Sequence, residues 1–311
     1  MSLQEFKTQT KHAFSNYGIV TGSRLTTAKI TERVLARLGS QVNYGYRPLE
    51  YDWDVMIILD ACRADLFEEF APQHPVSERF ESVSAKYSCA STSREWFEKG
   101  FGSAPSSEVS RVHYVSENPH LSRLDLERFY DVDRLWELRA STESGTLDPS
   151  IVTERALRSY YDTDADRFVV HYIPPHAPFL HCLEKYILQD KSWGGGSHDV
   201  WFGLQTGEFG REEVWQDYGT NLLRVLDEVE QLVKHVSGSV VVTADHANAI
   251  GEFGQYGHPG YVPVPGLKRV PWVRLTGEGT SYDPDELSAG KLETGDSDEM
   301  VKERLESLGY L

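Results

Sequence analysis

The sequence is poor in cysteine and has no long apolar run. Its three cysteines, Cys62, Cys89 and Cys182, are widely separated and form no Cys-x-x-Cys pair. A sparse, odd set of this kind indicates reduced thiols in an intracellular protein rather than a disulfide framework. No segment approaches the roughly 18 apolar residues of a membrane span, and the N-terminus lacks the apolar core of a signal peptide. We therefore expect a cytoplasmic protein without a membrane partner.

Positive charge is also scarce, because 31 Lys+Arg face 48 Asp+Glu and the net charge is −17. Such an acidic surface repels phosphate backbones, which argues against a general nucleic-acid binder. With 311 residues, 40% of them hydrophobic, the chain can bury one large core. We find no internal linker in the sequence. We expect an N-terminal helical extension, residues 1–50, packed on a single α/β domain, residues 51–311.

Apolar, β-branched runs alternate with helical patterns along the chain. Strands are expected at 54–60, 110–116, 167–173, 239–245 and 270–276. Helices are expected at 26–38, 92–99, 149–161 and 212–236, with a loop at 191–199 and an amphipathic helix at 296–311. Continuous apolar strands suit a sheet that is buried on both faces. The pattern predicts an α/β fold with a doubly wound, largely parallel central sheet flanked by helices.

Three of the expected strands end in side chains that can bind metal or carry protons. The first ends on Asp60, another runs through His171 into His176, and a third ends on Asp245-His246. Because ligand sites lie at the carboxyl ends of parallel strands, we expect these groups to converge. Two carboxylates and one imidazole suit a divalent metal, although a single Asp after a strand is usually a turn or cap residue. His171, inside its strand, is interpreted as a core residue whose polar groups are satisfied.

The stretch CASTSREWF offers a nucleophile for such a site. Thr92 and Glu95 form a capping box, which would occupy the Thr92 hydroxyl. Ser91 would then be free at a helix N-terminus, where developing negative charge is favoured. Metal coordination would lower its pKa and activate it. We favour Ser91, but the pattern leaves Thr92 and Ser93 open as nucleophiles, and all three hydroxyls could serve only as capping groups.

In chain order, these segments resemble the sulfatase-like branch of the alkaline phosphatase superfamily. The matching stretches are VMIILDACRADLF, VHYVSENP, HYIPPHAPF, YGTNLLRVLDEV, VVVTADHANAIGEFGQYGHPG and ERLESLGYL. The resemblance covers residues 50–311 and implies a set of metal ligands: Asp60, Ser91, Asp245 and His246. It also implies that His176 and His258 contact the oxygens of the transferred group or protonate the leaving group. Arg63 would bind substrate, although a surface salt bridge is the alternative.

The resemblance implies one divalent metal, Mg²⁺, Mn²⁺ or Ca²⁺. Two Zn²⁺ ions are the lesser alternative, because the Asp-x-x-x-His pattern of a second site is not evident. The sequence also departs from the DHG form of the family at Ala247, which stands where Gly is usual. At the nucleophile, sulfatases carry C-x-P-S-R and convert the first residue to formylglycine. Here Arg94 follows Cys89 by five residues, and Ser91 stands in the place of the proline.

An unmodified Ser or Thr nucleophile favours phosphoryl transfer. The sequence therefore predicts a metal-dependent hydrolase of phosphate (mono- or di-) or sulfate esters that acts on a small-molecule ester. Two alternatives stay open. One is a phosphotransferase of the same superfamily, and the other is a non-catalytic, sulfatase-like binding protein.

Overall fold

The structure is a computed structural model, and it describes residues 3–42, 44–140, 146–186 and 200–283. The loop expected at 191–199 and the helix expected at 296–311 lie outside these residues. Within the described part, none of the helices is both long enough and apolar enough to cross a bilayer.

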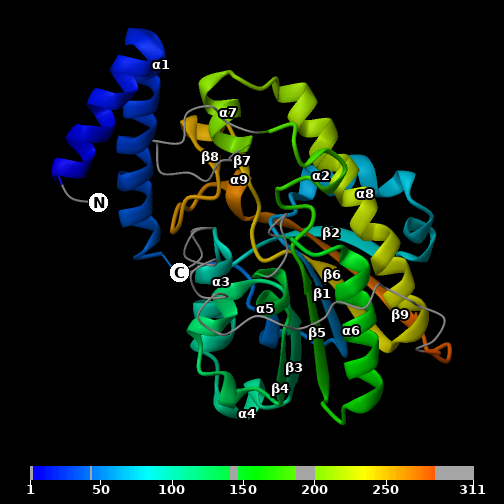
Figure 1. Ribbon diagram of the computed structural model, residues 1–311. Coiled ribbons are helices and arrows are strands. Elements are labelled where there is room, and N and C mark those ends of the chain that lie inside the picture. Colours follow the sequence, from blue (N-terminus) through cyan, green and yellow to red (C-terminus); the bar gives the residue numbers. More distant parts are fainter. Residues whose placement is uncertain (1–2, 43, 141–145, 187–199, 284–311) are drawn as a thin grey trace.

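A seven-stranded sheet forms the centre of the fold (Figure 1), in the order β2-β9-β6-β1-β5-β3-β4. Its strands are β1 (Val55–Leu59), β2 (Ser82–Tyr87), β3 (Val112–Ser116), β4 (Asp131–Arg134), β5 (Arg167–Tyr172), β6 (Ser237–Thr243) and β9 (Arg269–Glu278). Neighbours from β6 to β4 are parallel, whereas β9 pairs antiparallel with both β6 and β2. A separate two-stranded sheet joins β7 (Ala249–Ile250) to β8 (Tyr256–Gly257).

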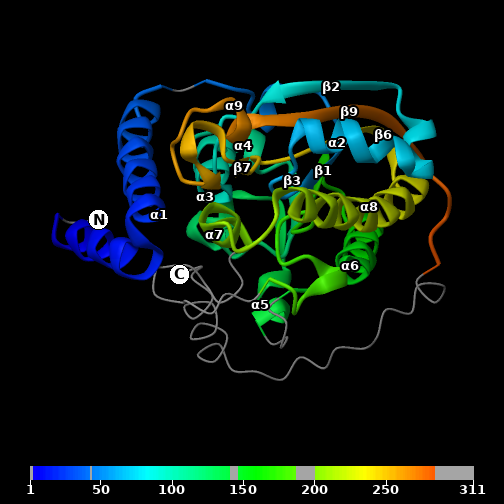
Figure 2. The same ribbon diagram turned by 90° about the horizontal axis from the view of Figure 1, so that it is seen from above.

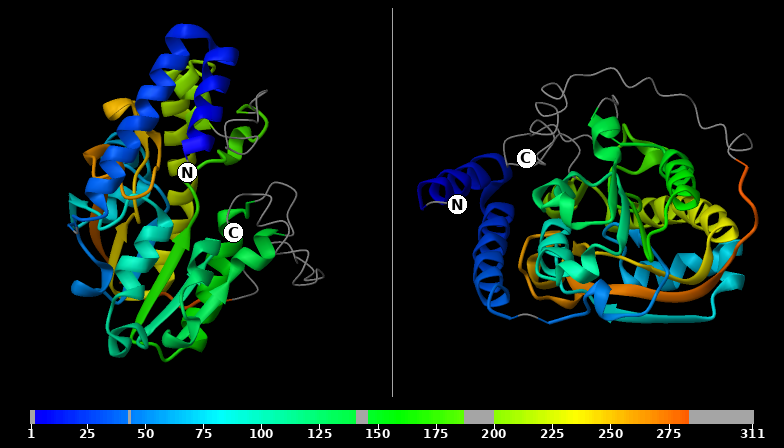
Figure 3. Two further views of the ribbon diagram at one scale, coloured as in Figure 1. Left: turned by 90° about the vertical axis from the view of Figure 1, so that its left-hand side faces the viewer. Right: turned by 90° about the horizontal axis from the view of Figure 1, so that it is seen from below.

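Helices cover both faces of the sheet, as Figures 2 and 3 show. The described α-helices are α1 (Leu3–Gly39), α2 (Ala64–Phe70), α3 (Ser93–Phe97), α4 (Ser106–Val109), α5 (Leu135–Ala140), α6 (Pro149–Asp162), α7 (Val200–Thr206), α8 (Arg211–His235) and α9 (Pro265–Lys268). On one face α8 packs against α2 and α6, and Thr153 of α6 hydrogen-bonds Tyr172 of β5 at 2.8 Å. On the other face Phe97 of α3 contacts Tyr114 of β3. The expected doubly wound, largely parallel α/β fold is confirmed.

The strands expected from the sequence are those at the centre of the sheet, together with β9. Val55–Leu59 and Val112–Ser116 are buried along their whole length, which explains their continuous apolar patterns. The expectation missed β2 and β4, which are the two edge strands. β2 is mostly exposed and β4 is four residues of mainly polar sequence. Edge strands bury less side-chain surface, so their sequences carry a weaker strand signal.

The N-terminal helix is much longer than expected, because α1 begins at Leu3 rather than at residue 26. It contains a break at Gly18, which has a positive φ of 73°, and Figure 3 shows its two halves folded back beside each other. They touch closely at Gly22, where an added Cβ would lie 2.9 Å from the Cα of Phe14. The division of the chain into an extension and one domain stays a prediction.

A substitution at Gly39, the last residue of α1, tests the contact between this helix and the segment that contains Tyr261. A Cβ on Gly39 would lie 1.9 Å from the carbonyl oxygen of Tyr261, and backbone cannot yield as a side-chain tip can. We expect Gly39→Ala to destabilise the attachment by about 1–3 kcal/mol, the usual range for overpacking. Hydrogen exchange should accelerate in residues 19–39 and not in the central sheet.

Leu38→Ala is the matched control, because Leu38 is 58% exposed on the same turn. It should change stability by less than about 0.5 kcal/mol. Equal exchange in wild type and Gly39→Ala would contradict the close contact with Tyr261.

Candidate metal site and active site

The site lies where three neighbouring parallel strands end. In the register of the sheet, Ile58 of β1 lies opposite His171 of β5 and Thr243 of β6. Asp60 and Asp245 therefore leave adjacent strands at the same level. Together with His171 they offer three buried ligand atoms that all lie within 4.8 Å of one another. The convergence expected from the strand ends is thus present.

Two carboxylate oxygens in this group have the environment of metal ligands. Oδ1 of Asp60 and Oδ2 of Asp245 are buried and accept no hydrogen bond from any residue the structure describes. Nε2 of His246 lies 3.5 Å from each of them. A buried, unsatisfied carboxylate oxygen is costly, and a cation between the two would satisfy both. These residues fit a divalent metal.

The tautomer of His246 also suits a ligand. Its Nδ1 lies 3.0 Å from the carbonyl oxygen of Ala247. Since a carbonyl can only accept, Nδ1 carries the proton, and the Nε2 of a neutral ring keeps its lone pair for a cation. Ala247 itself is fully buried, and its N–H donates to the carbonyl oxygen of Leu267 at 2.9 Å. Its φ is not positive, so the position does not require the usual Gly.

Backbone groups hold the second oxygen of Asp245. Its Oδ1 accepts from the N–H of Ala61 at 3.0 Å and from that of His246 at 2.9 Å. Ala61 has a φ of 59°, a left-handed conformation that costs a non-glycine residue about 1 kcal/mol. Its carbonyl in turn accepts the hydroxyl of Tyr218. These bonds fix the carboxylate so that Oδ2 is the oxygen left for a cation.

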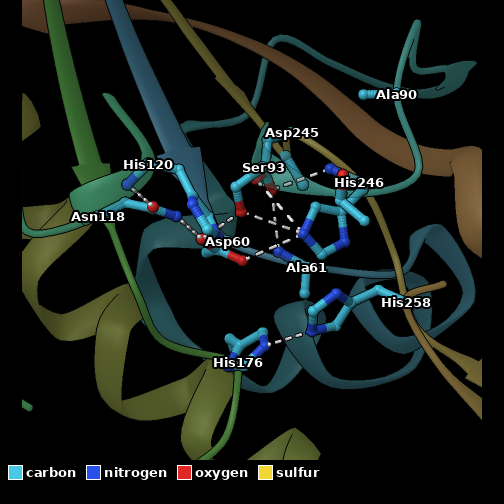
Figure 4. Close-up of polar contacts among 12 residues, drawn as sticks. Asp60, Ala61, Ala90, Ser93, Asn118, His120, His176, Asp245, His246 and His258 are labelled. Atoms are coloured by element: carbon cyan, nitrogen blue, oxygen red, sulfur yellow. Dashed lines mark hydrogen bonds and ion pairs between the residues drawn. The ribbon is translucent and has the colours of Figure 1, made fainter. Parts of the chain in front are cut away.

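Three side chains hold Oδ2 of Asp60 (Figure 4). Donors from Asn118, Ser93 and His171 lie at 2.8, 3.2 and 3.3 Å respectively. Burial alone would raise the pKa of Asp60, but the hydrogen bond from His171 and the nearby histidines lower it below its ordinary value. The carboxyl is therefore charged, as a metal ligand must be.

Asn118 is a site residue that the sequence reasoning missed. Its Oδ1 accepts the N–H of His120 at 3.0 Å, so the amide must turn its NH₂ group toward Asp60. Asn118 follows β3, and the rule that pointed to the other strand ends could have found it here.

His171 is fully buried and hydrogen-bonded, as expected, but it is not an ordinary core residue. Its Nε2 contacts Asp60, and its Nδ1 lies 3.0 Å from the hydroxyl of Tyr114. The prediction of a buried, satisfied histidine is confirmed, whereas the strand pattern could not show which groups face it.

The three neighbouring hydroxyls have different partners. Ser93 Oγ lies 3.2 Å from Oδ2 of Asp60 and 3.3 Å from Nε2 of His246. Thr92 caps α3 as expected, and its hydroxyl accepts the N–H of Glu95 at 3.2 Å. The hydroxyl of Ser91 contacts Oε2 of Glu95 at 2.9 Å and the carbonyl oxygen of Pro259 at 3.0 Å, and it hydrogen-bonds neither aspartate. The structure therefore brings Ser93, and not the favoured Ser91, to the carboxylate of Asp60 and to His246.

His176 and His258 face each other beside this cluster (Figure 4). Their Nε2 atoms lie 2.9 Å apart, and the rings of His258 and His246 are 4.9 Å apart. His176 Nδ1 donates to the carbonyl of Ala177, so in neutral rings the proton between the pair belongs to His258. Burial, with the neighbouring histidines, lowers the pKa of His258 well below its ordinary value. Burial also lowers the pKa of His176.

The loop that carries His176 is fastened by Asn221, a fully buried residue of α8. Its NH₂ group donates to the carbonyls of Pro175 and His176 at 3.1 and 3.3 Å. Its Oδ1 accepts the N–H of Leu180 at 3.0 Å. Helix α8 thereby sets the position of His176.

Arg63, expected to bind substrate, is placed differently. Its guanidinium forms a two-bond ion pair with Asp65, at 2.8 and 2.6 Å, and contacts Glu252 at 2.8 Å. It also donates to the carbonyl of Asn248 at 2.6 Å. These partners use its donors to tie the start of α2 to residues 248–252. Arg63 therefore holds the loop that follows His246, and the alternative of a salt bridge fits, although this one is buried.

A second group, His181, Cys182 and Asp217, also has metal-ligand types within 4.8 Å. Its carboxylate already accepts Nζ of Lys185 and the hydroxyl of Tyr186, each at 2.5 Å. An ammonium group on the same carboxylate disfavours a cation, so this group fits a metal less well.

Comparison with known proteins rests on structure alone. No family model and no curated protein sequence matches the chain. The soluble domain of lipooligosaccharide phosphoethanolamine transferase A from Neisseria meningitidis matches with a TM-score of 0.51 and 13% identity, over 76% of this chain and 80% of that one. The periplasmic domain of phosphoethanolamine transferase EptC from Campylobacter jejuni gives 0.50 and 14%, over 72% and 78%. The chain therefore shares the fold of these two phosphoethanolamine transferase domains.

The integral membrane form of the Neisseria meningitidis enzyme matches with a TM-score of 0.53 and 12% identity. It covers 89% of this chain, while this chain spans only 59% of it. All three structures are of phosphoethanolamine transferases, and at this identity they show a shared fold only, so the expected sulfatase-like branch stays a prediction.

A metal titration tests the cluster. After chelation, adding Mn²⁺ at about 100 times its Kd should stabilise the wild type by about 2.7 kcal/mol, measured as a rise in Tm. Asp245→Asn should remove this rise. Without metal the variant should be at least as stable as the wild type, because it removes repulsion from Asp60.

Asp217→Asn is the matched control, since it changes a carboxylate in the second group. It should keep the rise in Tm. A rise that survives Asp245→Asn and disappears in Asp217→Asn would move the metal to the second group.

Proposed function

We propose that this protein is a metal-dependent enzyme that cleaves phosphate mono- or diesters, with Ser93 as the nucleophile. The observation that carries the proposal is the position of the Ser93 hydroxyl, within 3.3 Å of both Asp60 and His246. A serine beside a metal site can attack phosphorus in line, because the activated oxygen and the charge-stabilising groups are already in place.

The proposed ligands are Asp60, Asp245, His246 and the Ser93 oxygen. When bound, a divalent cation supplies charge neutralisation for the phosphoryl oxygens and favours the alkoxide form of Ser93. Before a cation binds, the Ser93 hydroxyl donates to Oδ2 of Asp60 and lies beside Nε2 of His246, so its oxygen is already next to the other proposed ligands. Because Ser93 is the first residue of α3, the helix N-terminus adds a favourable field for negative charge there.

The histidine pair would serve the leaving group. As the Ser93 oxygen forms its bond to phosphorus, the ester P–O bond breaks and the leaving oxygen needs a proton. When the His176–His258 pair carries one additional proton, it can give that proton to the leaving oxygen and return to two neutral rings. The lowered pKa of both rings makes this cationic form a strong acid. Asn221 would hold His176 in position for this step.

The loop before α3 favours phosphate over sulfate esters. The thiol of Cys89 is fully buried, and burial raises its pKa to about 12. Ala90, at the edge of Figure 4, has no functional group to offer. Neither residue suits the modified aldehyde nucleophile of a sulfatase, whereas Ser93 needs no modification.

The second step decides between two enzyme classes. If water attacks the phosphoserine, the protein is a hydrolase; if an alcohol attacks it, the protein is a transferase. The fold shared with phosphoethanolamine transferase domains favours the transferase as the second candidate. The non-catalytic alternative gains no support from a site with this geometry.

Activity measurements on matched serine variants test the proposal. Aryl phosphate monoesters, diesters and an aryl sulfate are compared with Mg²⁺, Mn²⁺, Ca²⁺ and Zn²⁺, with and without an added alcohol. Ser93→Ala should lower kcat by at least about 10³-fold, as for the loss of other nucleophiles. Ser91→Ala should lower it by less than about tenfold, because the hydrogen bonds that are lost, to Glu95, Pro259 and Val262, do not involve the proposed ligands.

The reverse order of the two variants would assign the nucleophile to Ser91 and contradict the proposal. Wild-type protein that binds the metal and cleaves none of the esters would favour the binding-protein alternative. A new ester formed from the added alcohol would identify the transferase.

A further inference from the structure

Among the described residues, the two most exposed large apolar side chains are on helix α1. Ile19 is 80% exposed and Val20 is 75% exposed. Both directly follow the break at Gly18, at the tip of the folded helix (Figure 1). Five further large apolar residues on α1 or just after it are also exposed: Phe14, Ile30, Val34, Leu38 and Val42. Isolated exposed apolar residues are normal, but a cluster on one element indicates an interaction surface.

Several of these residues lie on one side of the second half of α1. Val34 and Leu38 are 14 and 18 residues after Val20, which is about four and five helical turns. Ile30 lies one turn before Val34 on the same side. The opposite side packs on the protein, where Leu35 and Ala36 contact a buried cluster that contains Val262. The exposed stripe and the attached face are therefore different sides of one helix.

The charge of α1 is opposite to that of the remaining chain. Residues 3–39 contain six Lys+Arg and two Glu, a net charge of +4. The other 25 Lys+Arg and 46 Asp+Glu leave −21 on all other residues. The basic residues are Lys7, Lys11, Arg24, Lys29, Arg33 and Arg37. Basic charge and exposed apolar side chains thus occur together on one helix of an acidic protein.

We propose that α1 docks on an anionic lipid surface, with the apolar stripe and the tip at Ile19 and Val20 entering the headgroup region. A helix that is apolar on one side and basic overall is the usual form of an interfacial anchor. Each Lys or Arg near an anionic leaflet adds about 1 kcal/mol of attraction. The sequence led us to expect no membrane partner; this surface needs no spanning helix.

A second copy of the chain fits the surface less well. Pairing α1 with α1 would bring +4 against +4. Pairing α1 with the acidic body of another copy is a head-to-tail contact, which produces a ring or an open filament rather than a simple dimer. A protruding tip of Ile19 and Val20 also needs a pocket in a protein partner, whereas lipid accepts it without one.

Docking would also place the site near the lipid. The attached side of α1 contacts the segment that carries His258: Gln255 donates to the carbonyl of Ala28 at 3.2 Å, and Gly39 touches Tyr261. The proposed docking of α1 on lipid does not depend on the proposed ester cleavage, so an experiment can contradict one proposal and leave the other standing.

Vesicle flotation of the full chain tests the inference. Vesicles of phosphatidylcholine alone are compared with vesicles of equal parts phosphatidylcholine and phosphatidylglycerol, at low and high salt. The wild type should float with the anionic vesicles and much less with the neutral ones. Ile19→Ser with Val20→Ser should lower the partition coefficient at least about tenfold, because two large apolar side chains are lost. Arg24→Glu should weaken binding mainly at low salt.

Val83→Ser is the matched control, because Val83 is 52% exposed on edge strand β2. It should bind like the wild type, and circular dichroism checks that each variant is folded. Three results would overturn the inference: no flotation of the wild type, equal binding to both vesicle types, or no effect of the Ile19/Val20 change. Self-association that the same change abolishes would assign α1 to a second copy instead.

Discussion

The site depends on two carboxylates that are buried face to face. Asp60 and Asp245 leave adjacent parallel strands, and each keeps an oxygen without a hydrogen-bond donor among the described residues. Two like charges in such a place are unfavourable unless protons or a cation compensate them. The surrounding histidines lower the pKa of Asp60 and so favour the charged form. The pairing of β1 with β6 thus places two buried carboxylates side by side, and a divalent ion between them would compensate their negative charge.

The other parts of the fold fix the groups around this pair. Ala61 and Tyr218 hold one oxygen of Asp245, Asn118 holds Asp60, and Asn221 holds the loop of His176. These supports come from the turn after β1, the loop after β3 and the long helix α8, which are far apart in sequence. Chemistry that needs sub-ångström placement requires support of this kind. It also explains why a residue as distant from the carboxylates as Asn221 belongs to the same functional unit.

The sequence was sufficient for the class of fold and for the convergence of Asp60, Asp245 and His246, because both follow from apolar strands and their carboxyl ends. The sequence was insufficient to predict which way individual side chains face. Ser91 and Ser93 are two residues apart, and the start of α3 decides which hydroxyl faces the aspartates. The partners of His171 and Arg63 are contributed by distant segments, so no local pattern contains them. The edge strands and the first half of α1 bury little side-chain surface, so their sequences lack the periodic apolar pattern that would predict a strand or a helix.

Diffraction from a crystal grown with Mn²⁺ tests the central claim most directly, because anomalous scattering locates the ion itself. The account predicts one strong peak about 2.0–2.6 Å from Oδ1 of Asp60 and Oδ2 of Asp245, with His246 and the Ser93 hydroxyl facing it. No peak at these carboxylates, or a peak only beside Asp217, would contradict it.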